Sequence, residues 1–440
     1  MASLGIDFGS SYTTVSWINP RHGKPEIVKF NGDGSVKYPS VILGTESGLI
    51  LGFDALSILE EVNKLSSDDR FEYLSNFIPS IKRTLNCNAV EFIGGHSYSH
   101  IDLLTAFFKN IKSLANAHCG NEYSFDSVTF SHPVEFEHSK VALMEEALKN
   151  AGFRDIKQIL EPVAAVLGYG IDHKIAEKEG ILVFDFGGGT IDVAFVQKNG
   201  STIRQLCAPK GNNMCGGQDF DFLIYEDLRK RILAEYDIDI TSNNCIDYGM
   251  LNSCRRLKEH FSGPNDSYET SIALVKDGKI YKYKYKLNRN AFNNIISPKV
   301  NEAVNVARIV INDINQKGYQ IHKVLLIGGS SQLTLVKELL IDCLKDCIID
   351  TCGEKDIAVA LGNISEEWYQ SEESGETKED IDNNDANDDT KVDKILLNKN
   401  KSMKCKRCGS EKCYKIENKR EYHCTEPECG WEGLNINVVF

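Results

Sequence analysis

Residues 5–18 read GIDFGSSYTTVSWI, and residues 182–196 read LVFDFGGGTIDVAFV. In both stretches an apolar run leads to Asp-Phe-Gly, small residues follow, and a second apolar run begins. Each Asp is followed eight positions later by Val, as Asp7 by Val15 and Asp185 by Val193. This pattern predicts a strand, a tight turn and a second strand. Two such units about 180 residues apart indicate a duplicated fold, with one turn from each half facing a common cleft.

The flanking sequence predicts alternating strands and helices. Apolar runs such as SVTFSHP (127–133) and KVLLIGGS (323–330) alternate with helix-period stretches such as VALMEEALKNAG (141–152) and LTLVKELLIDCL (333–344). This alternation favours an α/β fold. With 440 residues, 42% of them hydrophobic, the chain is long enough for several domains. We expect an α/β body at 1–365, an acidic disordered linker at 366–400 and a small metal-held module at 401–440.

The net charge of −13 is unevenly distributed along the chain. Residues 366–393 contain twelve Asp and Glu against two Lys, whereas residues 394–440 contain ten Lys and Arg against six Glu. The linker is therefore expected to be solvated, and the last segment is mildly basic. No apolar run is long enough to span a bilayer. The N-terminus lacks the pattern of a secretory signal, so a cytoplasmic location is expected.

The two turns have the composition of phosphate-binding loops. Backbone N–H groups converge on phosphate oxygens only where side chains leave room, and Gly9 to Ser11 and Gly187 to Thr190 are small. Asp7 and Asp185 precede the turns, where a carboxylate can hold Mg²⁺ through its water molecules. A single glycine-rich turn is more often an ordinary hairpin, but the matched pair indicates nucleotide binding.

From about Leu4 to Ile364 the chain resembles the nucleotide-binding domain of the heat-shock protein 70 (DnaK-like) chaperones. The resemblance rests on ordered motifs: the two turns, YPSVIL, FIPSIKRTL, SHPVEFEHS, ILEPVAAVLGYGID, GGQDFD, LNSCRRLKEHFS, VLLIGGSSQL and DIAVALG. It implies a two-lobed actin-like ATPase fold, in which a ribonuclease H-like unit is duplicated. It also implies ATP or ADP with Mg²⁺ as ligands.

The resemblance assigns roles to residues of this chain. It implies a γ-phosphate contact for Lys82, positioning of the attacking water by Glu161 and Asp192, and a place for Thr190 beside them. A phosphate and metal site is implied for Asp7, Gly9, Ser10, Ser11, Tyr12, Asp185, Gly187, Gly188 and Gly189, with Gly216 and Gly217 nearby. Contacts with the adenosine are implied for Lys258, Ser262, Gly328, Gly329, Ser330 and Asp356.

The chain also departs from the family pattern. Arg255 and Glu259 stand where the family usually has Glu and Arg, and Gln332 replaces an Arg, which puts base selectivity in question. Pro133 is kept, but Val141 stands where an arginine is expected, with Lys140 beside it. This departure puts the family's coupling to a partner domain in question. A peptide-binding domain is not recognisable after the body.

The last segment carries cysteine pairs with metal-ligand spacing. Cys405 and Cys408 form C-x2-C, Cys424 and Cys429 form C-x4-C, and Gly follows each pair. Four thiolates so spaced predict a Zn²⁺ site in a zinc ribbon, with Cys413 and His423 as bystanders. Interspersed basic and aromatic residues are compatible with nucleic-acid binding, but the modest charge favours a protein partner reached through linker and ribbon.

Three functional hypotheses follow. The first is a chaperone-like ATPase whose lobes close on ATP and reopen after hydrolysis. The second is a nucleotide-binding scaffold with little turnover, targeted by its ribbon to a protein complex or a nucleic acid. The third is a filament-forming actin-like protein or a small-molecule kinase, which GGQDFD and EPVAAVLGYG disfavour.

Overall fold

A computed structural model gives the architecture. It describes residues 2–365 except 22, 32–33, 63–72, 121–122, 201, 242–247, 277, 345–347 and 351–356; beyond residue 365 it describes only 404–405, 413–415, 421–424, 432–434 and 438–439. The chain divides into two units, Met1–Ser371 and Glu372–Phe440. Among the described residues, none of the helices combines the length and apolar character that crossing a membrane requires.

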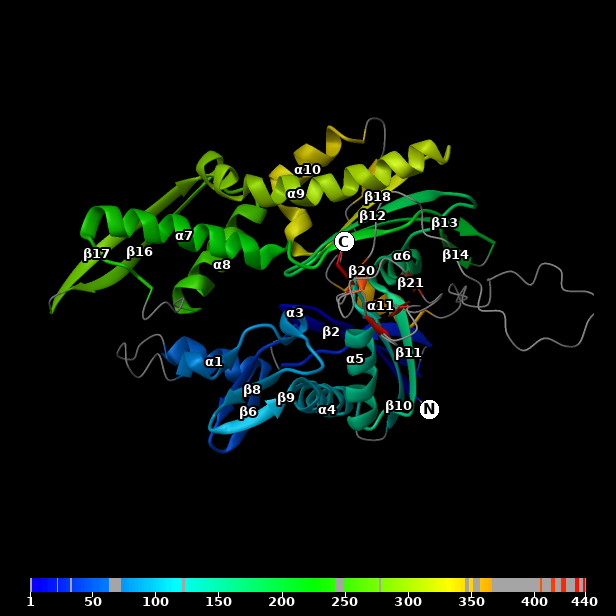
Figure 1. The fold of residues 1–440 in the computed structure, drawn as a ribbon, viewed down its shortest axis with the longest axis horizontal. Helices are drawn as coiled ribbons and strands as arrows, with labels where there is room; N and C mark the ends of the chain where they lie inside the picture. Colours follow the sequence, from blue (N-terminus) through cyan, green and yellow to red (C-terminus); the bar gives the residue numbers. More distant parts are fainter. Residues whose placement is uncertain are drawn as a thin grey trace, which may run out of the picture. The chain divides into compact units, whose positions relative to one another are not determined.

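Two mixed sheets with the same strand order form the two lobes of the first unit (Figure 1). The first runs β3 (Lys24–Ile27), β2 (Tyr12–Asn19), β1 (Ala2–Phe8), β10 (Phe125–His132), β11 (Asp155–Leu160), with β4 (Tyr38–Pro39) beside β2. The second runs β14 (Thr202–Gln205), β13 (Ile191–Asn199), β12 (Gly180–Phe186), β18 (Lys323–Ile327), β19 (Ile348–Asp350), with β15 (Lys210–Asn212) beside β13. In each, the first three strands are antiparallel and the last two join in parallel. The duplication is therefore present in the topology.

Helices and small sheets complete the first lobe. They are α1 (Gly52–Val62), α3 (Ile81–Thr84), α4 (His100–Cys119), α5 (His138–Asn150), β5 (Ile42–Thr45), β6 (Gly48–Leu51), β7 (Phe77–Ile78), β8 (Val90–Ile93) and β9 (His96–Ser99). The longest of these helices, α4, begins where Ser99 and Asp102 form a reciprocal capping box. Its inner face buries Leu104, Phe107, Phe108 and other apolar side chains against the sheet.

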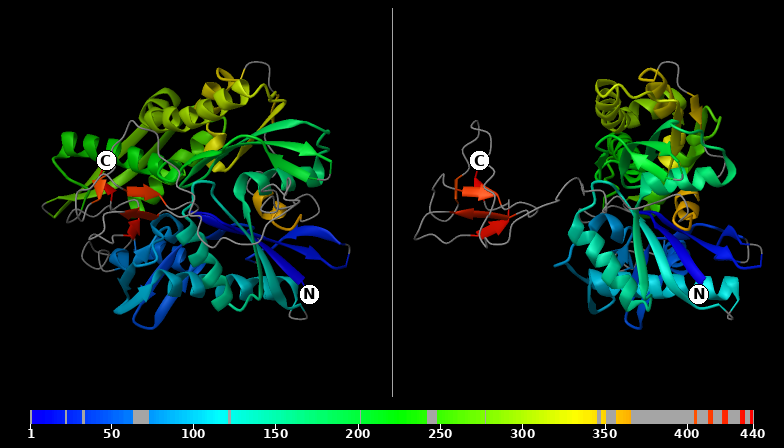
Figure 2. Two further views of the ribbon diagram at one scale, coloured as in Figure 1. Left: turned by 45° about the vertical axis from the view of Figure 1, so that its right-hand side comes forward. Right: turned by 90° about the vertical axis from the view of Figure 1, so that its right-hand side faces the viewer.

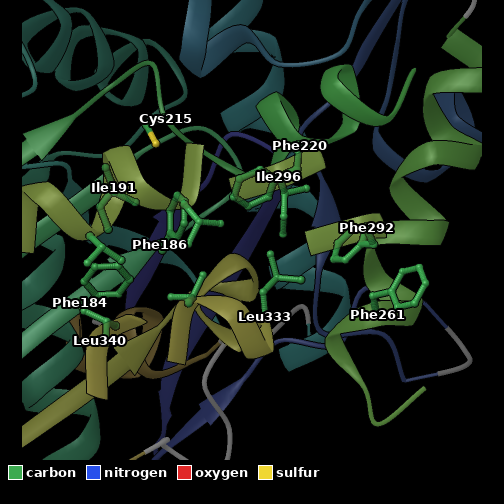
Figure 3. Close-up of a cluster of buried hydrophobic side chains, with 14 of the residues drawn as sticks. Phe184, Phe186, Ile191, Cys215, Phe220, Phe261, Phe292, Ile296, Leu333 and Leu340 are labelled. Atoms are coloured by element: carbon green, nitrogen blue, oxygen red, sulfur yellow. The ribbon is translucent and has the colours of Figure 1, made fainter. Parts of the chain in front are cut away.

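The second lobe has longer helices and a projecting hairpin. Its elements are α7 (Gly217–Tyr236), α8 (Tyr248–Ser262), the hairpin β16 (Ser267–Lys276) and β17 (Lys279–Asn288), α9 (Arg289–Gln316), η1 (Gly329–Gln332) and α10 (Thr334–Ile341). Figure 3 shows part of its core, where Phe184 and Phe186 of β12 lie near Phe220 of α7 and Ile296 of α9. Every residue of β12 is buried, as expected for a central strand covered on both faces.

Two helices that meet at Ala and Gly residues join the lobes. α6 (Glu161–Asp172) follows β11, and α11 (Ala358–Gly362) follows β19; α11 lies between the lobes in both views of Figure 2. A Cβ on Gly168 would come within 1.9 Å of the Ala358 carbonyl oxygen, and one on Gly362 within 1.7 Å of the Ala164 carbonyl oxygen. The two helices can therefore cross this closely only with glycine at both positions.

The second unit is described only through short strands. β20 (Lys404–Cys405) pairs with β24 (Val438–Val439), and β21 (Cys413–Lys415), β22 (Glu421–Cys424) and β23 (Glu432–Leu434) form an antiparallel sheet. Cys408 and Cys429 lie outside the described residues. Among the side chains that the structure does describe, no group of three or more His, Cys, Asp or Glu is arranged to hold a metal ion.

Candidate active site

A cleft of about 370 Å³ lies between the two lobes. Most of the predicted site residues line it: Asp7, Gly9, Ser10, Ser11, Tyr12, Lys82, Glu161, Asp185, Gly187, Gly188, Gly189, Thr190, Gly217, Lys258, Ser262, Gly328, Gly329 and Ser330. Residues separated by more than 300 positions in the chain thus meet in one site. Asp192 and Gly216 lie behind this lining, and Asp356 lies outside the described residues.

The two hairpin turns have the same backbone geometry and fit into one another. Gly9 N–H donates to the Tyr12 carbonyl at 3.0 Å, and Gly187 N–H donates to the Thr190 carbonyl at 3.0 Å. A Cβ on Gly188 would lie 2.4 Å from Ser11 Oγ, and one on Gly189 2.4 Å from Ser10 Oγ. The hydroxyls of the first turn therefore occupy the space that side chains of the second would need.

The turn at Gly216 and Gly217 packs against the backbone of the second hairpin turn. Gly217 N–H donates to the Gly187 carbonyl at 3.0 Å, and Gln218 N–H donates to the Gly188 carbonyl at 2.7 Å. A Cβ on Gly216 would come within 2.5 Å of the Gly189 backbone. Gly216 thus acts through this close backbone approach and does not face the cleft.

Lys82 and Glu161 form a buried ion pair in the floor of the cleft. The Lys82 Nζ lies 2.7 Å from Glu161 Oε1, and their side chains are only 4% and 8% exposed. Burial opposes the charge on Lys82, but the carboxylates of Glu161, Asp7 and Asp192 outweigh it and raise the pKa of Lys82. Lys82 is therefore positively charged at neutral pH and is held in place by α6.

The carboxylates crowd together on the second hairpin. Asp185 and Asp192 are directly opposite each other in the β12 and β13 register. Burial and the charges of Glu161, Asp192 and Asp7 raise the pKa of Asp185 well above its ordinary value. Burial and Glu161 raise the pKa of Asp192 to about 7. Such an excess of negative charge fits a site that is completed by a cation.

Asp192 is anchored by the segment that carries Pro133. The Val134 N–H donates to Asp192 Oδ1 at 2.9 Å, and Asp192 is 1% exposed. In the helix that follows, Val141 is buried in the first lobe's core. The Nζ of its neighbour Lys140 lies 5.7 Å from the centroid of the Phe136 ring. The segment that carries Pro133 therefore contacts Asp192 through the backbone N–H of Val134.

On the other side of the cleft, α8 and the segment after β18 face each other. Lys258 Nζ donates to the Gly217 carbonyl at 2.7 Å and lies 2.8 Å from Asp221 Oδ1. Burial lowers the pKa of Lys258, against the opposing effect of Asp221. Ser330 Oγ donates to the Gly187 carbonyl at 2.8 Å. Gly328 has φ +77°, and a Cβ there would lie 2.5 Å from the Phe186 carbonyl oxygen.

The residues that depart from the family pattern also line this side. Arg255 Nε lies 3.2 Å from Glu259 Oε1, and its guanidinium carbon is 4.8 Å from the centroid of the Tyr12 ring in the other lobe. Gln332 lines the cleft as well. Arg255 and Glu259 are four positions apart in a helix-period stretch. This spacing is the sequence signal that places them on one face of α8.

Further cleft residues carried no sequence signal of a role. Thr14, Lys37, Ile327, Leu333 and Val359 line the cleft, although none was predicted to do so. Thr14 is opposite Asp7 in the first hairpin, at the position that Asp192 has in the second. This equivalence is visible in the sequence, because Thr14 and Asp192 each stand seven positions after the Asp of their repeat.

Comparison with known proteins settles the family. Residues 3–366 match the family model described as Hsp70 protein. The chain belongs to the Hsp70 family. It is 26% identical over 339 residues to the chaperone protein DnaK of Thermotoga petrophila and 29% identical over 350 residues to that of Ureaplasma urealyticum serovar 10. Each alignment covers 77% of this chain, but only 54% and 53% of the two relatives.

This Hsp70 chain thus spans about half the length of the curated relatives it matches. Residues 3–366 form an Hsp70-family ATPase domain with a mixed α/β, actin-like architecture. Hsp70 domains bind ATP or ADP with Mg²⁺. The turns of small residues and the clustered carboxylates of this cleft fit such a ligand. The match ends at residue 366, so it does not include the cysteine-rich segment.

Proposed function

We propose that this protein is an ATP-hydrolysing, chaperone-like switch of the cytoplasm whose two lobes respond to the nucleotide. The observation that carries the proposal is the meeting of the Lys82 and Glu161 pair with Asp185 and Asp192 beside two glycine-rich turns. Phosphoryl transfer depends on positioning and on charge stabilisation. This cleft supplies groups for both.

In this proposal the two lobes share the phosphates and the metal, and each adds a catalytic group of its own. The backbone N–H groups of both turns bind the phosphates, and Asp7 and Asp185 hold the water molecules of Mg²⁺, which neutralises phosphate charge when bound. Lys82 offsets negative charge on the γ-phosphate. Asp192 orients the attacking water and accepts its proton, a role suited to a carboxylate whose pKa is about 7. Thr190 and Glu161 hold neighbouring groups in place.

Single-turnover hydrolysis of labelled ATP with Mg²⁺ tests the proposal. The wild-type chain is expected to convert bound ATP to ADP and phosphate. Asp192→Asn should bind ATP but lose most of this conversion, because an amide cannot accept the proton. Tight binding without hydrolysis in the wild type would overturn the switch and support the scaffold instead.

A scaffold with little turnover is a second candidate because of one observation. Arg255, Glu259 and Gln332 change the charge and hydrogen-bonding character of one side of the cleft relative to the family pattern. These residues are remote from Asp192 in the chain and would alter nucleotide affinity without removing the hydrolytic groups. Titration calorimetry with ATP, ADP and GTP measures base selectivity, and the single-turnover assay measures catalysis, so the two together distinguish weak base selectivity from a loss of hydrolysis.

We further propose that residues 401–440 form a zinc ribbon that docks on a protein client or complex. The register pairs Cys413 at the start of β21 with Cys424 at the end of β22. Cys405 and Cys408 precede β21, and Cys429 follows β22. This order of segments favours a site in which the pair Cys405 and Cys408 meets the pair Cys424 and Cys429 at one end of the sheet. Such an arrangement supports a four-thiolate site.

Metal analysis of the purified full chain tests the ribbon. One Zn²⁺ per chain is expected, and Cys424→Ser combined with Cys429→Ser should abolish it. Absence of zinc from the wild type after zinc-supplemented expression would contradict the proposal. Pull-down with and without an excess of nucleic acid would show whether the partner is a protein or a nucleic acid.

A further inference from the structure

Arg289, the first residue of α9, joins three segments of the second lobe. Its Nη1 donates to the Phe261 carbonyl at 3.0 Å and to Thr334 Oγ1 at 3.2 Å. Its Nη2 donates to the Gly263 carbonyl at 2.8 Å and to the Asn265 carbonyl. The guanidinium, whose donors form a planar fork, thus contacts the end of α8, the loop after it and the start of α10.

These segments continue directly into two walls of the cleft. Ser262, between Phe261 and Gly263, lines the cleft, and so does Leu333, immediately before Thr334. Neither wall belongs to the phosphate loops. Arg289 itself does not line the cleft, so any effect on the ligand passes through the backbone that it holds.

Arg289 is well placed to fix these walls because it is itself fixed. Its backbone N–H donates to the Asp266 carbonyl at 2.9 Å, and the preceding Asn288 caps α9 by accepting from the Ala291 N–H at 2.8 Å. One turn along α9, Phe292 stacks on Phe261 with ring centroids 4.5 Å apart, as Figure 3 shows. The guanidinium side chain is 18% exposed.

We propose that Arg289 is a positioning residue for the nucleoside part of the ligand. It holds the end of α8 and the segment from η1 to α10 at the separation that a nucleoside requires, whereas the phosphate end is built on other elements. This inference rests on the proposed nucleotide-binding function. A lysine cannot replace the fork, because one ammonium cannot reach both the carbonyl groups of Phe261 and Gly263 and the Thr334 hydroxyl in the same geometry.

The experiment compares two ligands that differ only in the nucleoside. ATP turnover is measured with Mg²⁺, and inorganic tripolyphosphate is titrated as a competitor, for the wild type, Arg289→Met and Arg289→Lys. Both variants are expected to raise the KM for ATP about tenfold or more, since small displacements of positioning groups have large effects. The kcat and the inhibition constant of tripolyphosphate should change by less than about twofold, because the phosphate loops are intact.

Arg229 provides a matched control in the same lobe. It also makes a two-pronged contact, with Nε and Nη2 each 2.8 Å from an Asp239 oxygen. Unlike the partners of Arg289, Asp239 is not adjacent in the chain to a residue that lines the cleft. Arg229→Met should leave all three kinetic quantities unchanged. Thr334→Val removes only the contact with α10, and we expect about a threefold rise in KM for ATP from loss of one hydrogen bond.

The outcomes separate the inference from the function on which it rests. An equal loss of affinity for ATP and tripolyphosphate in the folded Arg289 variants, or a lower melting temperature with both affinities kept, would overturn the positioning role alone. A wild-type chain that binds tripolyphosphate and ATP equally would overturn it as well. No binding of ATP by the wild type would overturn both the inference and the proposed function.

Discussion

The two hairpins that face the cleft have the same backbone and different chemistry. β1 and β2 form one, β12 and β13 the other, and their turns make matching hydrogen bonds at Gly9 and Gly187. Opposite Asp7 the first has Thr14, whereas opposite Asp185 the second has the buried carboxylate of Asp192. The duplicated scaffold therefore provides two hairpin turns with matching backbone hydrogen bonds, but only the second hairpin carries the extra acid.

The difference extends to the tips of the turns. Ser10 and Ser11 in the first face Gly188 and Gly189 in the second, and the close approach leaves room for side chains on one side only. The first lobe adds Lys82 and Glu161 instead, from α3 and α6. The positive charge of Lys82 thus lies on the first lobe and the extra carboxylate of Asp192 on the second.

Substituting Asp192 should have the largest effect on hydrolysis, and substituting Thr14, its register match in the first hairpin, should have little. Asp192→Asn should lower the single-turnover rate of ATP hydrolysis by about 10² to 10⁴, the usual range for loss of a general base. Thr14→Val, at the equivalent position of the first hairpin, should change it by less than about threefold. Quenched-flow measurement checks both. Equal losses in the two variants would show that the hairpins are functionally alike.

Removing the positive charge of Lys82 should lower the stability of the folded protein. Lys82→Met leaves Glu161 buried without its partner, so the free energy of unfolding should fall by about 3 kcal/mol or more. Urea denaturation of the nucleotide-free protein measures this. Lys149→Met, which breaks an exposed pair with Glu145 on α5, is the control and should cost less than about 1 kcal/mol. A similar loss in both variants would contradict the assignment.

The raised pKa of Asp192 predicts a dependence of stability on pH. Its pKa rises from an ordinary value of 3.8 to about 7 on folding, so the folded state binds more protons between these values. Stability therefore falls as the pH rises through this window. From pH 5 to pH 8 the nucleotide-free wild type should lose about 3 kcal/mol relative to Asp192→Asn. Parallel pH profiles of the two proteins would exclude the shift.

The contact between the turn tips gives the smallest expected effect. A methyl group in Gly189→Ala would lie 2.4 Å from Ser10 Oγ, so we expect about a tenfold loss of ATP affinity as the loops move apart. Ser10→Gly in the same chain should restore most of it, since it vacates the space. Titration calorimetry measures the ATP affinity of the wild type, the two single variants and the double variant, which together form a double-mutant cycle. Failure of the second change to compensate would place the defect elsewhere.

Much of the site could be predicted from local sequence. The turns need small residues and a preceding Asp, and these requirements are visible at Asp7 to Ser11 and at Asp185 to Thr190 without any knowledge of the rest of the fold. Lys82 required the family resemblance, because nothing local distinguishes it from an exposed Lys beside Arg83. Thr14, Lys37 and Leu333 were not found, because lining a cleft depends on what lies opposite.

Arg289 shows why such residues escape sequence reasoning. Its partners Phe261, Gly263 and Asn265 offer carbonyl groups, which every residue has, so their identity gives no signal. The raised pKa of Asp192 has no sequence signal either. Its causes are burial and the charge of Glu161, and both exist only once the chain is folded. Long-range contacts of this kind follow from packing alone.

The sequence by itself determined the duplicated hairpins, the α/β class and the Hsp70 resemblance, because strand period, turn composition and motif order are local properties of the chain. Only the tertiary structure decided that Asp192 lies behind the cleft and that Ser10 and Ser11 exclude side chains from the opposite turn. It also decided that Arg289 ties two walls together. These depend on distances between segments far apart in the chain, which the packing of the two lobes sets.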